Sequence, residues 1–468
     1  MPSAIRRLAS VFALGLAFAA LPLAAEGPDP SLGQSPDAKP LAIGEAVAAG
    51  LASDPGIRSG SFDLISARAK SMDALFRMLP SLTVSSGYTK LSDEPAMSTA
   101  GIPTSLVPLL ALFSGAPTDS KDLRVDLQYP VFAGFRAREA AEIAKLAALG
   151  KEAALELTRR GFAFDIQRSY WEAQRAAANV ASLAKGLELE NVVKAEVRSM
   201  SEQGMATSAD LLAEQARYDQ TALALDEAKA GQALADLVLA SLSGDASASK
   251  DPGAIVYDLV TKPGSRPFAD PGTDSAKLIQ EALARRPETR AGSIALDVSR
   301  HAKVVAAGDL MPTLVLTGNV AYSNPDPRLF PVQDKFNLTW SAGARIRYDL
   351  GALPGATERI KAAEADMEKA GSDLERLRNA IALDVRKSVL VDQRARNSLE
   401  PTKGMVTQAE ENLRVAKSRY DNGVAKRSEL LQAQIALLRA QFAVENKTID
   451  IEIAEADLLR AIAADSAF

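Results

Sequence analysis

Four short segments of alternating apolar and polar residues interrupt a chain that otherwise consists of long, alanine-rich helical stretches. The clearest of them, FNLTWSAGARIRYDLG, begins at Phe336. A period of two places successive side chains on opposite faces of a β-strand, so this segment has one apolar and one strongly polar face. The sequence therefore predicts a sheet that contacts an apolar environment on one side and water on the other.

Each alternating segment is about ten residues long, which is the length that a tilted strand needs to cross a bilayer. The aromatic residues form two groups that flank aliphatic ones, as in the aromatic girdles of membrane proteins. We predict lipid-facing positions at Tyr88, Tyr129, Tyr322, Phe336, Trp340 and Tyr348, and lumen-facing positions at Arg124, Asp126, Arg345, Arg347 and Asp349. The alternative is a soluble sandwich whose apolar face is covered by a second sheet or by helices.

Four strands cannot close a barrel, and an open strand edge is not tolerated in lipid. If the strands lie in a membrane, several chains must therefore share one barrel. Three copies would give twelve strands, with the long helices packed into a tube beside them.

The chain is a tandem duplication, because residues 54–82 align without a gap to residues 286–314, as Gly60 does to Gly292. These equivalent residues lie 232 positions apart, whereas the later blocks GMATSADLL and GVAKRSELL lie 219 positions apart. The first copy therefore has extra residues between these blocks, and we place them in one long loop, at 92–121.

Each copy is predicted to contain a helix, a strand, a loop, a strand, a very long helix, a glycine break and a shorter helix. These elements lie at 56–78, 81–91, 92–121, 122–131, 136–201, 203–208 and 209–242 in the first copy, and at 276–309, 313–322, 323–335, 336–348, 356–420, 421–427 and 428–463 in the second.

The second long helix carries a heptad seam, with steps of three and four residues that are typical of a coiled coil. The seam consists of Ile360, Ala363, Met367, Ala370, Leu374, Leu377 and Ile381. A helix of about 65 residues spans roughly 100 Å at 1.5 Å per residue, which is longer than a compact domain. Taken alone, these helices would also fit a secreted or surface coiled-coil structural protein or adhesin.

The N-terminus MPSAIRRLASVFALGLAFAALPLAAEG has a basic start, an apolar core and small residues before the expected cleavage site, which predicts a secretory signal peptide. We divide the chain into a signal peptide (1–25), a disordered tether (26–40), a first repeat (41–242), a connector (243–275), a second repeat (276–464) and a tail (465–468). The Pro/Gly-rich connector is expected to pack as a small equatorial layer.

Composition excludes several function classes. The formal net charge of −5 offers no basic surface for nucleic acid, and the absence of cysteine excludes disulfides and thiolate metal sites. One histidine, His301, lies on a polar helical stretch and is expected to be solvated. We therefore predict no enzymatic activity and no cofactor.

The chain resembles the outer membrane efflux protein family, the TolC-like channels, over roughly residues 41–464. The resemblance rests on the double repeat and on three motifs. These are EALARRPETR with the similar segment GLASDPGIR in the first repeat, LQYPVFAGFRAREAAEIA, and RYDNGVAKRSELLQAQ. It implies a homotrimeric channel-tunnel, with a twelve-stranded barrel in the outer membrane and a long periplasmic α-barrel. It also implies partners, namely a periplasmic adaptor (membrane fusion) protein and an inner-membrane transporter, in efflux or type I secretion.

The resemblance also implies a gate at the periplasmic tip, where a tyrosine and a basic residue bond to an acidic residue and hold the pore shut. Tyr420 and Asp210 match two of these positions, but Ala425 stands where the basic residue is expected. The predicted tip residues are Gly204, Asp210, Tyr420, Gly423, Lys426, Arg427 and Glu429. Alternatively, the acids Asp210 and Glu429 are only favourable charges at helix N-termini.

Overall fold

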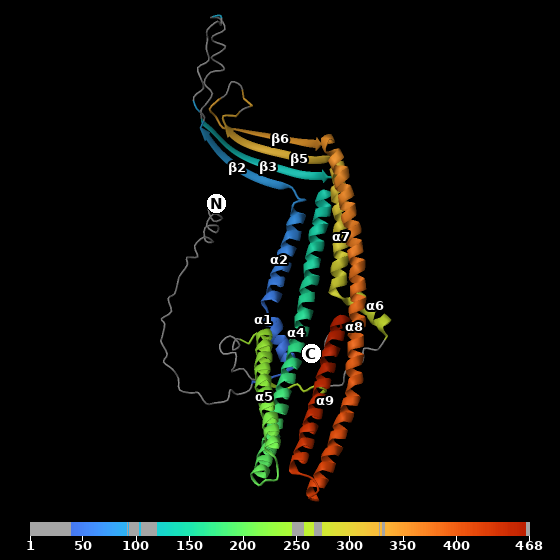
Figure 1. The fold of residues 1–468 in the computed structure, drawn as a ribbon. Helices are drawn as coiled ribbons and strands as arrows, with labels where there is room; N and C mark the ends of the chain where they lie inside the picture. The colour runs from blue at the N-terminus through green and yellow to red at the C-terminus, as the bar shows by residue number, and fades with distance from the viewer. Residues whose placement is uncertain are drawn as a thin grey trace, which may run out of the picture. The chain divides into compact units, whose positions relative to one another are not determined.

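Long helices and a four-stranded sheet make up most of the computed structural model (Figure 1). The structure describes residues 39–90, 92, 103, 119–245, 257–265, 274–326, 328–329 and 333–464. The helices are α1 (Ile43–Ser53), α2 (Pro55–Phe76), α4 (Arg136–Glu202), α5 (Ser208–Ser243), α6 (Ser275–Arg285), α7 (Pro287–Ala307), α8 (Leu353–Asp421) and α9 (Arg427–Ala461). The strands are β1 (Lys39–Leu41), β2 (Ser81–Lys90), β3 (Asp119–Ala133), β4 (Tyr257–Leu259), β5 (Thr313–Asn324) and β6 (Asn337–Arg347), with the 3₁₀ turns η3 (Gly308–Leu310) and η4 (Leu350–Ala352).

The predicted order of elements is confirmed in both repeats, with one error in the second. The sequence predicted one helix over 276–309, whereas the structure breaks it at Arg286, whose φ and ψ are −65° and 130°. Pro287 causes the break, because a proline disfavours helical geometry in the residue before it. Asp54 is extended before Pro55 for the same reason, and the short helix α1 that precedes it was not predicted.

The signal peptide, most of the tether, most of the loop 92–121 and the tail 465–468 lie outside the described residues. Residues 39 and 40, which the sequence assigned to the tether, form part of β1. The tether therefore does not extend as far as residue 40.

The heptad seam on α8 packs as predicted, since each of its seven residues is buried or half-buried. A Cβ atom at Gly292 of α7 would lie 2.9 Å from Leu374 Cδ1, so the absent side chain allows α7 to approach α8. The first repeat makes the equivalent contact, because a Cβ atom at Gly60 would lie 3.1 Å from Leu155 Cδ1. The duplication is thus visible in packing as well as in sequence.

None of the helices in the described ranges is both long enough and apolar enough to cross a membrane.

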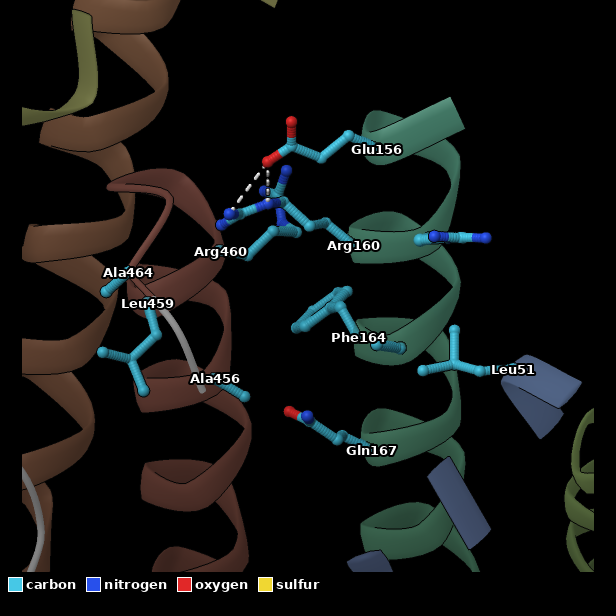
Figure 2. Close-up of a pocket in the computed structure, with 11 residues that line it drawn as sticks. Leu51, Glu156, Arg160, Phe164, Gln167, Ala456, Leu459, Arg460 and Ala464 are labelled. Carbon is cyan, nitrogen blue, oxygen red and sulfur yellow. Dashed lines mark hydrogen bonds and ion pairs between the residues drawn. The ribbon is translucent and has the colours of Figure 1, made fainter. Parts of the chain in front are cut away.

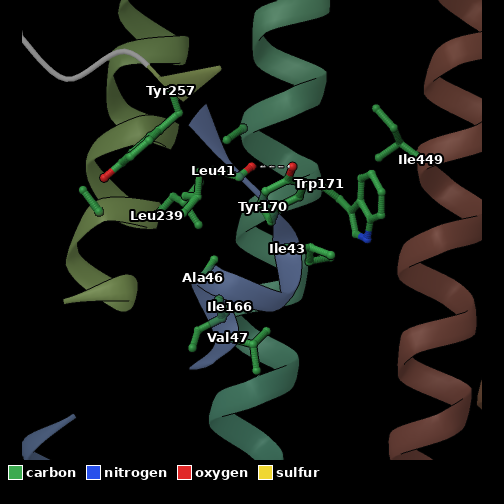
Figure 3. Packing of buried hydrophobic residues seen from close by; sticks show 12 residues of the cluster. Leu41, Ile43, Ala46, Val47, Ile166, Tyr170, Trp171, Leu239, Tyr257 and Ile449 are labelled. Atoms are coloured by element: carbon green, nitrogen blue, oxygen red, sulfur yellow. Dashed lines mark hydrogen bonds between the residues drawn. The ribbon is translucent and has the colours of Figure 1, made fainter. Parts of the chain in front are cut away.

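A buried layer joins the helices near the middle of α4 (Figure 3). The strands β1 and β4 pair in parallel there, and Leu41 and Tyr257 contribute to an apolar cluster around Trp171. The Tyr170 hydroxyl donates to the Leu41 carbonyl oxygen at 3.0 Å and accepts from the Thr261 N–H at 3.0 Å. Residues 257–261 of the connector therefore take part in this layer.

The four large strands form one antiparallel sheet in the order β2-β3-β5-β6. Each repeat supplies one pair of strands, and the repeats meet where β3 pairs with β5. The register between β3 and β5 shifts between Pro130 and Phe132, which fits the missing N–H of proline.

One carboxylate joins three elements at the junction of sheet and helices. Asp309 of η3 accepts from Arg136 Nη1 at 2.7 Å and from Arg359 Nη2 at 2.8 Å, so it links the first residue of α4 to the second turn of α8. The hydrogen bond from Arg359 and the charges of both guanidinium groups lower the pKa of Asp309. The backbones of Gly134 and Gly308 also meet there, leaving no room for a Cβ atom at either residue.

His301 is not solvated as predicted. It is half-buried and its Nδ1 atom bonds to the Glu139 carboxylate, which ties α7 to α4. The sequence could not show this pairing because the two residues are far apart along the chain.

A buried acid on α5 makes the stability of this helix layer depend on pH. Burial raises the pKa of Asp236 to about 6, because desolvation disfavours the ionised carboxylate. The ionised form therefore destabilises the fold at pH 7.5, and this cost disappears below the unfolded pKa of about 4.

We expect Asp236→Asn to raise the free energy of unfolding by about 1 kcal/mol at pH 7.5, after allowance for solvent screening, and to change it little at pH 3.5. Thermal unfolding of the purified protein at both pH values measures the difference. Asp226→Asn, at an exposed position on the same helix, is the matched control. Equal effects of the two substitutions at pH 7.5 would contradict the assignment.

Candidate functional site

The apolar face of the sheet is exposed across all four strands. One row of it runs through Val84, Val125, Val320 and Trp340, which the register places side by side. Trp340 is 72% exposed and Val84 is 65% exposed. In a soluble sandwich this face would be covered, but within the described ranges most of its large side chains are exposed.

The predicted aromatic residues lie toward the two ends of this face. Tyr322 and Phe336 stack with their ring centroids 4.9 Å apart at the end of the sheet remote from the helix junction, and Tyr88 lies near the same end of β2. Trp340 is further in, opposite Val320. Tyr129 lies in the half of β3 that leads to the helices, and Tyr348 directly follows β6.

The opposite face is polar, and its charges are distributed unevenly. Asp126 accepts from the Asn319 side-chain amide at 2.7 Å, and Arg124 pairs with Asp122 at 3.1 Å. Arg345 and Arg347 lie at the end of β6 that leads into α8, where the register puts uncharged residues beside them.

Asp349, predicted as a strand residue that faces the lumen, lies beyond the end of β6. Its side chain accepts from the Ala352 N–H at 3.3 Å and caps η4.

The two outer strands of the sheet each have one free edge. Within the described residues, β2 pairs only with β3 and β6 pairs only with β5. The unpaired N–H and C=O groups along both edges are able to bind a further strand.

At the opposite ends of the long helices, two turns connect α4 to α5 and α8 to α9 with the same backbone geometry. Gly204 and Gly423 both adopt positive φ, at 71° and 73°, as a tight turn requires. Met205 N–H donates to the Met200 carbonyl at 2.8 Å, and Val424 N–H donates to the Arg419 carbonyl at the same distance. The two tips are therefore equivalent copies in their main chain.

Side chains at the first tip make a helix cap. The Asp210 carboxylate accepts from the Thr207 N–H at 2.9 Å and from the Thr207 hydroxyl at 2.7 Å, and the Asp210 N–H donates back to that hydroxyl. These bonds lower the pKa of Asp210, and the charge of Lys426 at the other tip lowers it further. The reading of Asp210 as a helix N-terminal acid is thus supported, while Lys426 provides a basic group close to it.

The second tip carries different side-chain chemistry on the same backbone. Lys426 replaces the capping threonine, and Glu429, the equivalent of Asp210, pairs with Arg419 at 3.4 Å. Tyr420 is about 39% exposed, and Arg427 begins α9. Among the described contacts at the tips, none is a hydrogen bond between Tyr420 and Asp210.

A pocket between α4 and α9 was not predicted (Figure 2). It has a volume of roughly 270 Å³, and Arg160 and Arg460 are among the residues that line it. Arg160 donates to the Ala463 carbonyl oxygen at 3.0 Å, and the Arg460 guanidinium lies 5.3 Å from the Phe164 ring centroid. These contacts hold the C-terminal end of α9 against α4, and only tertiary structure brings them together.

Comparison with known proteins connects this geometry to a family. The sequence model described as "Outer membrane efflux protein" matches residues 278–464. No curated protein matches the chain.

Several solved channels share the fold. VceC of Vibrio cholerae, an outer membrane protein, is 19% identical, with 90% of this chain and 95% of that chain covered and a TM-score of 0.73. The CmeC outer membrane channel of Campylobacter jejuni is 15% identical, with 96% and 94% covered and a TM-score of 0.75. The open state of the MtrE outer membrane channel of Neisseria gonorrhoeae is 16% identical, with 90% and 88% covered and a TM-score of 0.69.

The predicted TolC-like fold is confirmed by these likenesses, and the predicted family resemblance is confirmed over residues 278–464. The family model supports an outer-membrane efflux function, whereas the solved channels, each below 25% identity, show the fold alone.

The assignment of the two sheet faces is testable at neighbouring positions. We expect Trp340→Arg, on the apolar face, to destabilise the membrane-inserted protein by about 2 kcal/mol or more, because a charge would face lipid. Ser341→Arg, on the polar face, should be tolerated. Yield and heat resistance of the protein extracted from outer membranes provide the measurement. Equal losses in both variants would show that the two faces are not in different environments.

Proposed function

We propose that the chain forms the homotrimeric outer-membrane channel of a tripartite efflux or type I secretion system, a passive duct from the periplasm to the outside. The observation that carries the proposal is the four-stranded sheet with one exposed apolar face and two free edges. A coiled-coil stalk or adhesin has no use for such a sheet.

The free edges argue for a shared barrel. Outer-membrane lipid on the apolar face cannot hydrogen-bond to backbone groups, so β2 and β6 need partners within the bilayer. Three protomers whose β2 edges pair with neighbouring β6 edges would supply twelve strands and leave no edge. The polar face, with Arg124 and Asp126, would then line a water-filled lumen.

The long helices argue for a periplasmic tunnel. The helix pairs α4–α5 and α8–α9 are each joined by a turn, and the two turns have equivalent backbones. In the trimer, these turns would together form the tip. A tip of this kind is suited to contact a periplasmic adaptor protein, which would link the duct to an inner-membrane transporter. The energy for export would come from that transporter, since the duct only provides a path.

The shared barrel is testable by crosslinking, because the chain contains no cysteine. Strand tilt offsets the register across a subunit boundary, so Ser85→Cys on β2 is combined in turn with a cysteine at Asn337, Thr339, Ser341 or Gly343 on the polar face of β6. After export in a Gram-negative host, a short bismaleimide should convert at least one of these double variants to covalent trimers in the outer-membrane fraction. Each single-cysteine variant should remain monomeric on denaturing gels. A soluble monomer would contradict the proposal, and so would crosslinked products without a defined size.

The tip residues provide a test of gating. Asp210 lies close enough to Lys426 for the lysine charge to lower its pKa, and Tyr420 lies at the end of α8. If this cluster holds the tip closed, Asp210→Asn with Tyr420→Phe should leave trimers intact and raise the single-channel conductance in planar bilayers.

Thr207→Ala is the matched control for that test, since it removes the partner of Asp210 within the cap but keeps the carboxylate. Its conductance should stay close to that of the unmodified protein. Unchanged conductance in the Asp210/Tyr420 variant would show that these residues only stabilise the turn.

A further inference from the structure

Arg345 and Arg347 are set apart from the other charged residues on the polar face of the sheet. Asp126 is bonded to Asn319 and Arg124 is paired with Asp122, but no ion pair involves either β6 arginine among the described residues. Both arginine side chains are exposed.

The register explains why these two arginines have no partner within the sheet. Arg345 lies opposite Val315, which lies opposite Pro130, and Arg347 lies opposite Thr313. The acid on this face nearest to Arg345 within the sheet is Asp126, two strands across and four residues along. At about 3.4 Å per residue and 4.8 Å per strand, the two backbone positions are about 17 Å apart, which is about twice the screening length of about 8 Å at physiological salt.

The strand of a second protomer that would adjoin β6 does not supply a counter-charge. The proposed neighbour of β6 is β2 of the next chain, whose polar-face residues are Ser81, Thr83, Ser85, Gly87 and Thr89. None of these side chains is charged. The arginines would therefore find no counter-charge on the strand that adjoins β6 in the assembled trimer.

The surrounding junction does not neutralise them either. Asp349 follows Arg347 by two residues, but its carboxylate caps η4, and it is one acid against two arginines. Asp309 is already shared by Arg136 and Arg359. At the tip, by contrast, the acids Asp210 and Glu429 each have a basic group close by.

We infer that Arg345 and Arg347 form a basic ring at the helix-proximal end of the barrel lumen, which binds anionic solutes and favours their passage. Three protomers would contribute six guanidinium groups, and a ring of arginines is a recognised means of anion selectivity in pores. Guanidinium groups suit carboxylate and phosphate groups in particular, because they donate two parallel hydrogen bonds. This inference rests on the proposed function, since it requires that the polar face lines the lumen.

The test is ion selectivity of the full-length protein in planar bilayers, from the reversal potential in a tenfold KCl gradient. We expect a chloride-to-potassium permeability ratio above one, and a loss of this preference in Arg345→Gln/Arg347→Gln. Arg345→Lys/Arg347→Lys keeps both charges and should keep the ratio. Asp349→Asn retains a side chain that can cap η4 and should raise the ratio. Tripolyphosphate added at the barrel side should reduce the current of the unmodified channel more than that of the glutamine variant.

Two outcomes distinguish this inference from the proposed function. The channel could conduct normally but have a chloride-to-potassium permeability ratio below one, or a ratio that the glutamine substitutions do not change. Either result would overturn the basic ring alone. Failure of the folded protein to form any conducting channel, with the tip variant Asp210→Asn/Tyr420→Phe included, would overturn the proposed function and the ring with it.

Discussion

The pairing of backbone hydrogen bonds at the sheet edges is the constraint on which the structure depends. A strand with a free edge is tolerable in water but costs several kcal/mol for each unsatisfied group in hydrocarbon. This protein combines two such edges with an apolar face on which Trp340 and Val84 are exposed. In a bilayer, the two features would conflict in an isolated chain and agree only in an assembly. The sheet thus accounts for the length of the strands, their alternation and the proposed trimer.

Much of the fold could be predicted because its signals are local and occur twice. Alternation located all four large strands to within a few residues, and the heptad seam from Ile360 to Ile381 located the contact surface of α8. The break at Arg286 was not predicted, although Pro287 directly follows it and disfavours helical geometry there. β1 was missed because three residues that pair with a distant strand carry no periodic signal.

Side-chain partners were harder to predict than elements, because most of them are distant in sequence. His301 bonds to Glu139, and Arg160 reaches the carbonyl of Ala463, and neither pair follows from local spacing. At the tips, duplication predicted equivalent backbones but not their different side-chain networks. Thr207 completes a cap with Asp210, whereas the equivalent Lys426 cannot, which leaves Glu429 to pair with Arg419. The predicted roles of these tip residues remain predictions.

The shared carboxylate of Asp309 has a mechanical consequence. It joins the start of α4 to the start of α8 beside the point where the Gly134 and Gly308 backbones touch, so the two longest helices are pinned together where they leave the sheet. A long helix that is held at one end moves most at its other end. Movements of α4 and α8 would therefore grow with distance from this anchor, and the strands could stay still while the far turns swing apart.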